Sequence, residues 1–293
     1  MVSGIDLGSN TLRICVMNES ANIISSSEAI VGSARNLKQG SKLDSSAKER
    51  ITTALYEFSK RYDLKTCKAV ATEAFRMASD SDEFFKEIEF KFGVKFELIS
   101  GETEAKLTAL AIKNRLKKLG ISPKKALFVD LGGGSSEISF EDNFESFKFG
   151  IVTFFNEFNT LEKMQENAHN MVQNATKFMK KFDFDKIILT SGVPTTLAAL
   201  RLGMDYVSYN ATKVNGINLS YHEIKEAINK ISLLDANKAQ KLLGKDRQML
   251  VVGGCIILCA MLEFCKDKKF IVIDDGLREG VCLAQLQKAK NVF

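Results

Sequence analysis

Three consecutive glycines, Gly132, Gly133 and Gly134, lie between an apolar run and two serines in the segment LFVDLGGGSSEISF. Without side chains, a turn of this kind lets backbone N–H groups close around an anion and lets the backbone adopt positive φ angles. The hydroxyl group of Ser135 adds another hydrogen-bond donor. This composition predicts a loop that binds phosphate.

A second turn of the same form lies near the start of the chain, in GIDLGSNTLRI. Its glycine is Gly8, and the polar residues that follow are Ser9, Asn10 and Thr11. Each turn contains Asp-Leu-Gly, once from Asp6 and once from Asp130. Two ordinary hairpins are the alternative interpretation. The repeated tripeptide favours two loops that hold phosphates from both sides of a cleft.

Carboxylates flank both turns, and they need a partner of opposite charge. An acid beside a phosphate is repulsive unless a cation lies between them. Mg²⁺ prefers oxygen ligands and bridges carboxylates to phosphate oxygens. The sequence therefore predicts metal or water partners at Asp6, Asp130 and Glu137. Neither a P-loop pattern nor a dinucleotide-binding pattern is present in these turns.

The surrounding pattern of strands and helices predicts two halves that begin alike. Residues 2–18 and 121–140 each contain strand, glycine turn and strand, and helices alternate with strands after each. Gly93 is a candidate C-terminal cap of a helix, and a later helix is expected to end at Gly120. A duplicated α/β domain is therefore expected, with domains at residues 1–118 and 119–293 joined near 117–125. Whether the last helix packs back on the first domain is left open.

Composition narrows the class of protein further. A chain of 293 residues favours two domains. The net charge of +5 suits an anionic ligand but does not indicate nucleic acid. Six cysteines without CxxC spacing and only two histidines argue against zinc. Four of the cysteines lie in apolar runs and are expected in the core: Cys15, Cys255, Cys259 and Cys282.

The N-terminal residues do not resemble a signal peptide, and no uninterrupted apolar run reaches the roughly 18 residues of a membrane span. We therefore expect a cytoplasmic protein that acts without a membrane.

GIDLGSNTLRI and VDLGGGSSEIS resemble the paired phosphate motifs of the exopolyphosphatase and guanosine pentaphosphate phosphatase family. ATEAFRMASD, ISGETEAKL, TSGVPTTLAAL and DDGLREG continue the resemblance in the family's order over nearly the whole chain. The resemblance implies two actin-like (ribonuclease H-like) α/β domains around a central cleft. It also implies hydrolysis of a terminal phosphoanhydride in polyphosphate or guanosine pentaphosphate. The form expected is the short one, without a C-terminal helical domain.

By this resemblance, Glu104 matches the glutamate that activates water, and Asp130 and Glu137 match acids near the metal and the reacting phosphate. Gly132 to Ser135 match the backbone cradle. Arg76 and Arg278 match basic residues that face the anionic substrate. Mg²⁺ is the cofactor implied, and K⁺ is left open as a second cation.

Two features of this interpretation have alternatives from the residues themselves. Glu104 could instead cap the start of a helix, and Glu102, two residues earlier, competes for the same catalytic role. Pro194 and Phe154 depart from the family's pattern and leave substrate contacts near them open.

Two other classes of function remain beside hydrolysis. A binding regulator with weak turnover is disfavoured by the acids that are present, and a kinase is disfavoured because no sugar-binding motif is evident. The expected partners are polyphosphate or guanosine penta- and tetraphosphate, without nucleic acid. A homodimer is left open.

Overall fold

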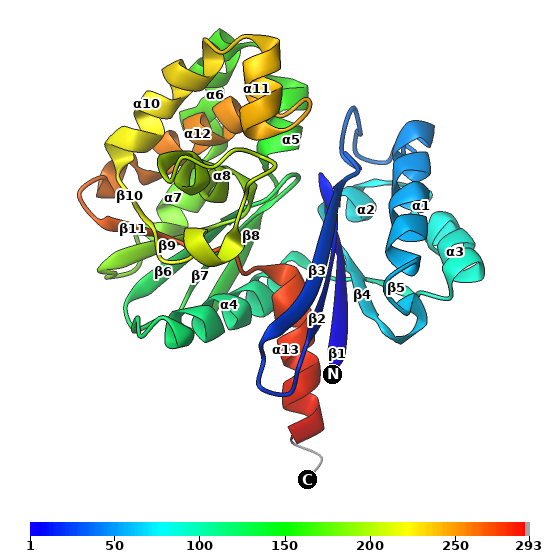
Figure 1. Cartoon of the computed structure of the whole chain (residues 1–293). Helices are drawn as coiled ribbons and strands as arrows, with labels where there is room; N and C mark the ends of the chain where they lie inside the picture. Colours follow the sequence, from blue (N-terminus) through cyan, green and yellow to red (C-terminus); the bar gives the residue numbers. More distant parts are fainter. Residues whose placement is uncertain (291–293) are drawn as a thin grey trace. The chain divides into compact units, whose positions relative to one another are not determined.

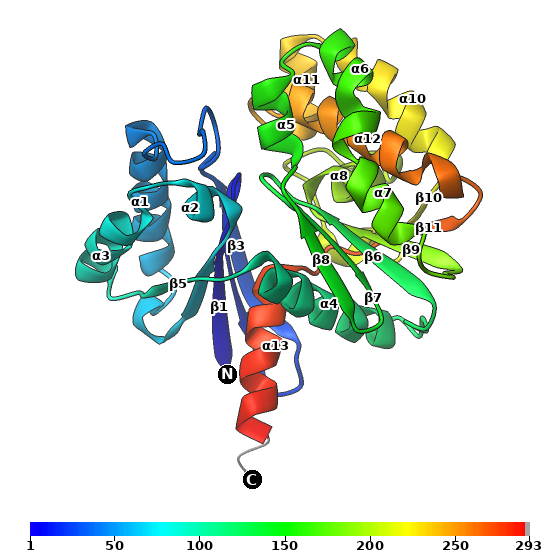
Figure 2. The same ribbon diagram turned by 180° about the vertical axis from the view of Figure 1, so that it is seen from behind.

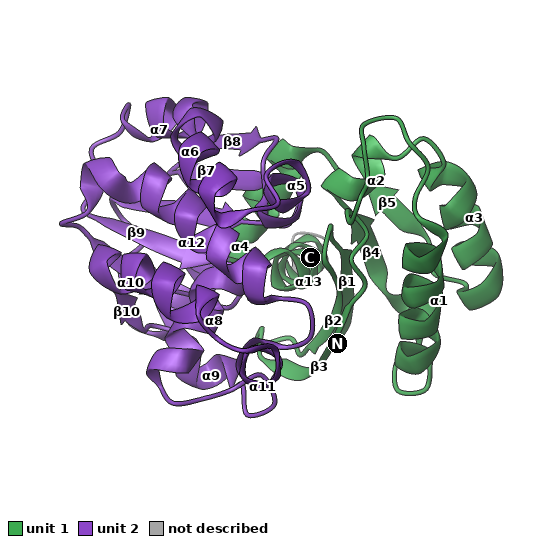
Figure 3. Cartoon of the chain, turned by 90° about the horizontal axis from the view of Figure 1, so that it is seen from above, with its two compact units in different colours: residues 1–111, 276–293 green, residues 112–275 purple. Residues whose placement is uncertain are grey.

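The computed structural model describes residues 1–290 and divides the chain into two compact units. The first unit comprises residues 1–111 and the segment that begins at Gly276, and the second comprises residues 112–275 (Figure 3). The first division falls inside helix α4 (Gly101–Lys118), seven residues before the predicted boundary at 118. A continuous helix carries no change of composition at such a point, so the sequence pattern could not locate it.

The first unit contains a five-stranded sheet in the order β3-β2-β1-β4-β5. The first three strands pair antiparallel, whereas β1, β4 and β5 run parallel. Helices α1 and α3 lie on one face of this sheet, and α13 lies on the other (Figures 1 and 2). The strands are β1 (Val2–Leu7), β2 (Thr11–Met17), β3 (Ile23–Ile30), β4 (Lys68–Ala71) and β5 (Phe96–Leu98). Besides the first part of α4, the helices of this unit are α1 (Ser45–Ser59), η1 (Leu64–Thr66), α2 (Glu73–Met77), α3 (Ser81–Phe92) and α13 (Leu277–Lys290).

Local signals in the sequence explain where several of these helices begin and end. Asp44 accepts a hydrogen bond from Ser46 N at the start of α1. Gly93 has φ 69° and caps the end of α3, which confirms the predicted C-terminal glycine.

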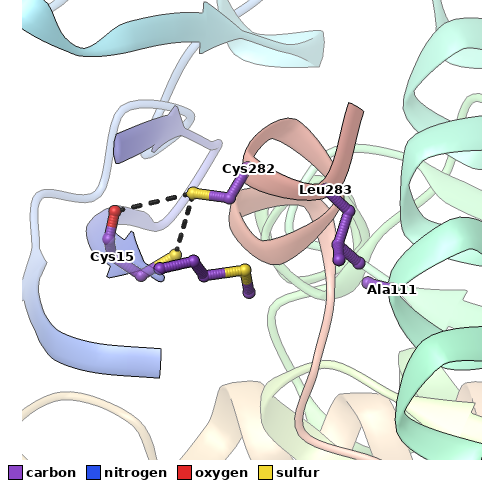
Figure 4. Packing of buried hydrophobic residues seen from close by; sticks show 5 residues of the cluster. Cys15, Ala111, Cys282 and Leu283 are labelled. Atoms are coloured by element: carbon purple, nitrogen blue, oxygen red, sulfur yellow. Dashed lines mark hydrogen bonds between the residues drawn. The ribbon is translucent and has the colours of Figure 1, made fainter. Parts of the chain in front are cut away.

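The last helix packs closely on β1 and β2. A Cβ atom on Gly4 would lie 2.9 Å from the carbonyl oxygen of Arg278, so only glycine permits this approach. Figure 4 shows Cys282 pointing toward Cys15, and their Sγ atoms are 3.4 Å apart. Hydrogen bonding between the two thiols and burial raise the pKa of Cys15, which keeps it protonated. All four cysteines predicted in the core are buried.

Gly280 provides a test of a second contact of α13, which is with α4. A Cβ atom there would lie 2.1 Å from the carbonyl oxygen of Leu107 on α4, which is backbone and cannot turn aside. We expect Gly280→Ala to lower the free energy of unfolding by roughly 1–3 kcal/mol, measured by denaturant unfolding. Gly276→Ala is the matched control, because no described atom lies within 4 Å of its added Cβ. Equal stability of the two variants would contradict the close approach of α13 and α4.

The second unit contains a six-stranded sheet in the order β10-β11-β9-β6-β7-β8. Strands β6, β9 and β11 run parallel, and β6, β7 and β8 form an antiparallel meander. The strands are β6 (Ala126–Leu131), β7 (Ser136–Phe140), β8 (Asn143–Phe147), β9 (Lys186–Thr190), β10 (Asn218–Leu219) and β11 (Lys269–Val272). The first helices are α5 (Ile151–Glu157), α6 (Leu161–Met171), α7 (Gln173–Met179) and α8 (Gly192–Arg201). The later helices are α9 (Ala211–Val214), α10 (Tyr221–Ser232), α11 (Ala236–Leu243), α12 (Gln248–Leu262) and η2 (Glu263–Cys265).

Both sheets therefore begin with a strand, a turn and an antiparallel strand, and both place the first of these beside a parallel strand that comes later in the chain. This arrangement confirms the predicted fold class of two mixed α/β domains.

Residues 248–265 form the segment that most resembles a membrane span among the described residues. By length and composition, Gln248–Cys265 is apolar enough to cross a membrane, although Glu263 interrupts it, so the expectation that no uninterrupted apolar run reaches 18 residues still holds. In the structure, 72% of this segment is buried, and α12 packs against α5, α6 and α10 (Figure 1). A helix enclosed by other helices is apolar on every side, so the same composition serves a protein core.

Candidate active site

The predicted residues of the first unit follow three parallel strands that end at one edge of its sheet. Leu7 O at the end of β1 accepts from Thr72 N, 3.3 Å away, and Ala71 O at the end of β4 accepts from Ile99 N at 3.1 Å. The residues after these strands are the Gly8 turn, α2 and the start of α4. In open α/β sheets, ligands bind at the carboxyl ends of the strands. This edge is therefore the candidate site of the first unit.

The first glycine turn is closed by its own backbone and held by the loop after β3. Gly8 N donates to Thr11 O at 2.9 Å, and Ser9 O accepts from Ala34 N at 2.8 Å. Asn10 O accepts from Val31 N at 2.9 Å. The side-chain oxygen of Asn10 is buried and has no hydrogen-bond partner within residues 1–290. A buried acceptor of this kind suits a donor from a ligand, water or metal-bound water.

Arg76 lies between two glutamates rather than alone. Its Nε atom is 2.6 Å from Glu73 Oε2, and its Nη1 and Nη2 atoms are each 3.2 Å from Glu104 Oε2. Nη1 also donates to Ile99 O at 2.7 Å. Burial would lower the pKa of Arg76, but the negative charges of Glu104 and Glu73 and their hydrogen bonds outweigh it and raise that pKa. We call Glu73, Arg76 and Glu104 the acid–arginine cluster.

The structure separates the two glutamates that the sequence left as alternatives. Glu102 is 63% exposed and pairs with Lys106 at 2.6 Å, one turn along the surface of α4. The side chain of Glu104 is 11% exposed and contacts Arg76. Ser100, not Glu104, caps the helix, because its Oγ accepts from Thr103 N at 3.2 Å. Of the two glutamates, Glu104 is the buried one, and its role in activating water stays a prediction.

Arg278 has a similar arrangement at the start of α13. Its Nε atom donates to Glu279, whose other carboxylate oxygen accepts from Gly276 N at 2.9 Å. Glu279 is 1% exposed. Each of the two predicted arginines is thus fixed through Nε by a buried glutamate nearby in the sequence.

The second glycine turn has its carbonyl groups engaged on one side. Gly132 O accepts from Ile151 N at 2.9 Å, and Gly133 O accepts from Val152 N at 2.8 Å. Gly134 O accepts from the hydroxyl of Thr153 at 3.4 Å. Because α5 takes the carbonyls, the peptide planes of the turn are held in one orientation. A turn whose oxygens are all directed to one helix can present its N–H groups to an anion on another side.

Space, and not φ, explains Gly132 in the second turn, whereas a Cβ atom on Gly8 in the first turn would make only ordinary contact, 3.4 Å from Thr11 O. None of Gly8, Gly132, Gly133 or Gly134 has a positive φ, so that expectation was wrong. A Cβ atom on Gly132 would lie 2.7 Å from Ser135 O. A Cβ on Gly150 would lie 2.5 Å from the carbonyl carbon of Gly133, which shows how closely α5 approaches the turn.

Asp130 and Glu137 are cross-strand partners in β6 and β7. Side chains directly opposite one another lie on the same face of a sheet, and like charges there repel. Glu137 is 3% exposed, and its Oε1 accepts from Ser146 Oγ at 2.8 Å. In the first unit, the residue opposite Asp6 in the register is Arg13, which also lies 3.5 Å from Glu28, so the first unit has a cation where the second has a carboxylate. The pair in the second unit is the better candidate for a cation.

A metal site made entirely of protein ligands is not evident. Within the described residues, no group of three or more histidine, cysteine, aspartate or glutamate side chains could hold a metal ion. Mg²⁺ commonly uses only one or two carboxylates and completes its shell with water and phosphate oxygens. The donor set of Asp130 and Glu137 fits that mode of binding.

Helix α8 begins beside the second turn. Ser191, which precedes it, has φ 84°, a conformation that costs energy outside glycine. Its hydroxyl donates to Leu131 O and accepts from Gly192 N. Arg247, which precedes α12, also contacts α8, because its Nη2 atom donates to Thr196 Oγ1 at 3.3 Å. A helix N-terminus with an arginine beside it favours an anionic ligand.

The two departures from the family pattern have structural explanations. Pro194 lies in the first turn of α8, where a missing N–H costs nothing. Phe154 is fully buried in α5 and packs edge to face against Phe158, so it is a core residue and not a substrate contact.

Sequence reasoning missed Glu73, Glu279, Ser191 and Arg247. Glu73 precedes Arg76 by three residues within ATEAFRMASD, a spacing that places both on one side of a helical turn. Glu279 follows Arg278 directly, so both glutamates could have been found. No spacing signal links Arg247 to Thr196, which lies 51 residues earlier.

Comparisons with known proteins identify the family to which the chain is similar. The sequence model of the Ppx/GppA phosphatase family matches residues 15–289. A putative exopolyphosphatase of Haemophilus influenzae is 26% identical, over 96% of this chain and 90% of that protein. A guanosine-5'-triphosphate,3'-diphosphate pyrophosphatase of Pseudoalteromonas translucida is also 26% identical, over 98% of this chain. The chain spans 59% of the length of that second relative.

Solved structures give the same relationship. The Ppx/GppA family member of Aquifex aeolicus is 28% identical, with a TM-score of 0.77, and 98% of each chain is covered. An exopolyphosphatase from Cytophaga hutchinsonii is 20% identical, with a TM-score of 0.84 over 98% of each chain, and supports the fold alone.

Proposed function

Because the chain belongs to the Ppx/GppA phosphatase family, we propose that it hydrolyses the terminal phosphoanhydride bond of inorganic polyphosphate or of guanosine pentaphosphate. Both substrates end in the same chemical group, a phosphoryl group joined through an anhydride oxygen. The names of the two relatives support one substrate each. The proposal for this chain therefore covers both, and an assay decides between them.

The observation that carries the proposal is the orientation of the second glycine turn. Its three carbonyl groups are engaged by the first residues of α5 and by Thr153. A turn that binds an anion presents N–H groups to it and keeps its carbonyl oxygens away from it. Because α5 binds the three carbonyl oxygens, this turn is suited to that role. We assign Gly132, Gly133, Gly134 and Ser135 to the phosphate cradle of the second unit. Gly8, Ser9, Asn10 and Thr11 are assigned to that of the first.

Glu104 is the proposed catalytic base. It would accept a proton from the attacking water while the substrate phosphate is held in line with it. Its burial and its contact with Arg76 keep the carboxylate in one place. Arg76 and Arg278 supply positive charge for the anionic substrate, and Arg247 is a further candidate near Gly192.

Asp130 and Glu137 would hold Mg²⁺. Bound there, the ion would offset the repulsion between the two carboxylates and the phosphates and polarise phosphate oxygens. Asp6, whose cross-strand partner is an arginine, stays a proposed metal or water partner. K⁺ as a second cation, a cytoplasmic location and a homodimer also remain proposals.

Release of inorganic phosphate from each substrate, with Mg²⁺ and no acceptor, tests the proposal. We expect turnover of at least one substrate by the whole chain. Binding of both without phosphate release would favour a regulator, and transfer from ATP to an added acceptor would favour a kinase. Either outcome would contradict the proposed hydrolysis.

A further inference from the structure

Glu73 occupies a position that the proposed reaction does not yet use. It is the first residue of the short helix α2 and is 7% exposed. We propose that Glu73 is a positioning residue, which holds Arg76 in contact with the catalytic base Glu104. This inference rests on the proposed function, since it assumes that Glu104 acts on water.

The hydrogen bonds define the orientation of the guanidinium group. Glu73 Oε2 engages Nε at 2.6 Å, and Ile99 O engages Nη1 at 2.7 Å. A guanidinium group is planar and rigid, so contacts on two of its nitrogens fix both its plane and its rotation. The contact of Nη1 and Nη2 with Glu104 Oε2 at 3.2 Å then follows from those two contacts.

The lengths of the two contacts indicate which glutamate fixes the position of Arg76. The Glu73 contact is 0.6 Å shorter than the Glu104 contact, from 2.6 and 3.2 Å. The shorter contact is also a hydrogen bond within one turn of α2, so its two ends move together. Glu104 receives the longer one from a different helix. Glu73 therefore sets the position of Arg76, and Arg76 sets the position of Glu104.

Arg76 and Glu104 already pair with each other, and Glu73 adds a second negative group that engages the same guanidinium group. Arg76 and Glu104 are 20% and 11% exposed at their side chains, so each needs a partner of opposite charge. With Glu73 the cluster has one positive and two negative groups. Without Glu73, Arg76 would be attracted more strongly to the phosphates of the substrate and less firmly held toward Glu104. Loss of Glu73 should therefore lower kcat without raising KM.

A structural role alone is the competing explanation, because an acidic residue in the first turn also stabilises a helix. The two explanations differ in their kinetics. A merely structural glutamate affects the fraction of folded protein and leaves the kcat of the folded protein unchanged.

The test compares Glu73→Ala and Glu73→Gln with the wild type, on whichever substrate the wild type turns over. Misplacement of a catalytic group costs up to about 100-fold in rate. We expect Glu73→Ala to lower kcat by about 10- to 100-fold with KM unchanged or lower. Glu73→Gln keeps a hydrogen-bond acceptor for Nε and should recover most of the loss. If Glu73→Ala does not fold, a kcat for Glu73→Gln below the wild type, with KM not raised, still supports the inference.

The matched control is Asp80→Asn. Asp80 is a buried acid of the same unit that pairs with Lys48 at 2.7 Å and accepts from Leu43 N, and it has no contact with Arg76 among the described interactions. This variant should lose stability and keep the kcat of the folded protein. In an Arg76→Ala background, Glu73→Ala should have no further effect on kcat.

Three results would overturn the inference, and they differ from a failure of the proposed function. Wild-type kcat in both Glu73 variants, a raised KM at unchanged kcat, or an additive loss in the Arg76→Ala background would each reject positioning while hydrolysis by the wild type stands. A wild type that releases no phosphate from either substrate rejects the proposed function itself, and the positioning role with it.

Discussion

Glu104→Gln is expected to lower kcat by about 10²- to 10⁴-fold, the range that general-base catalysis typically contributes. Glutamine keeps the size and hydrogen bonding of the side chain but cannot accept a proton at neutral pH. In phosphoryl transfer, positioning and charge stabilisation supply the rest of the acceleration, so activity should not vanish. KM should change little, because the phosphate cradles are untouched. Steady-state phosphate release, with chemistry shown to be rate-limiting, measures the effect.

Glu102→Gln is the matched control for this prediction. It removes one carboxylate two residues earlier on the same helix, where the side chain is 63% exposed and paired with Lys106. Its kcat should stay near that of the wild type. A loss in Glu102→Gln that equals the loss in Glu104→Gln would move the catalytic role to the surface residue and contradict the structural assignment.

Removal of divalent cations is expected to abolish turnover. Asp130 and Glu137 lie opposite one another across β6 and β7, and without a cation their charges would repel the phosphates of the substrate. Excess chelator should stop phosphate release, and added Mg²⁺ should restore it. Chelator saturated with Mg²⁺ controls for effects of the chelator itself.

A variant connects this cation requirement to the proposed ligands. Glu137→Gln should raise the Mg²⁺ concentration for half-maximal activity by about 10- to 100-fold. Glu145→Gln, an exposed residue of the adjacent strand β8, should leave it unchanged. Full activity in excess chelator, or equal Mg²⁺ dependence in the two variants, would contradict the cation site.

The sequence predicted those parts of the fold that depend on neighbouring residues, such as turns and the ends of helices. The strand and glycine-turn patterns in residues 2–18 and 121–140 predicted two strand-turn-strand units, and Gly93 predicted the end of α3. The division of the chain inside α4 was not predictable, because it depends on which contacts form in three dimensions. The facing of the two turns across a cleft stays a prediction.

In the candidate site, too, features that depend on tertiary contacts could not be predicted from the sequence. Resemblance assigned Glu104 and Arg76, but the rotation of α4 that buries Glu104 and exposes Glu102 is set by tertiary packing. The glycines were predicted correctly as a feature of the turn and wrongly as carriers of positive φ, because close contacts such as Gly150 with Gly133 are invisible in a sequence. Arg247 meets Thr196 only through the fold of the second unit.

The origin of the oxygen in the released phosphate tests the central claim most directly. If water attacks the terminal phosphorus, hydrolysis of polyphosphate or guanosine pentaphosphate in H₂¹⁸O should place one ¹⁸O atom in each phosphate released. Mass spectrometry of that phosphate should show this label in nearly every molecule. Phosphate without label would contradict attack of water at the terminal phosphorus, and transfer of the terminal phosphoryl group to another molecule without release of phosphate would contradict hydrolysis by this chain.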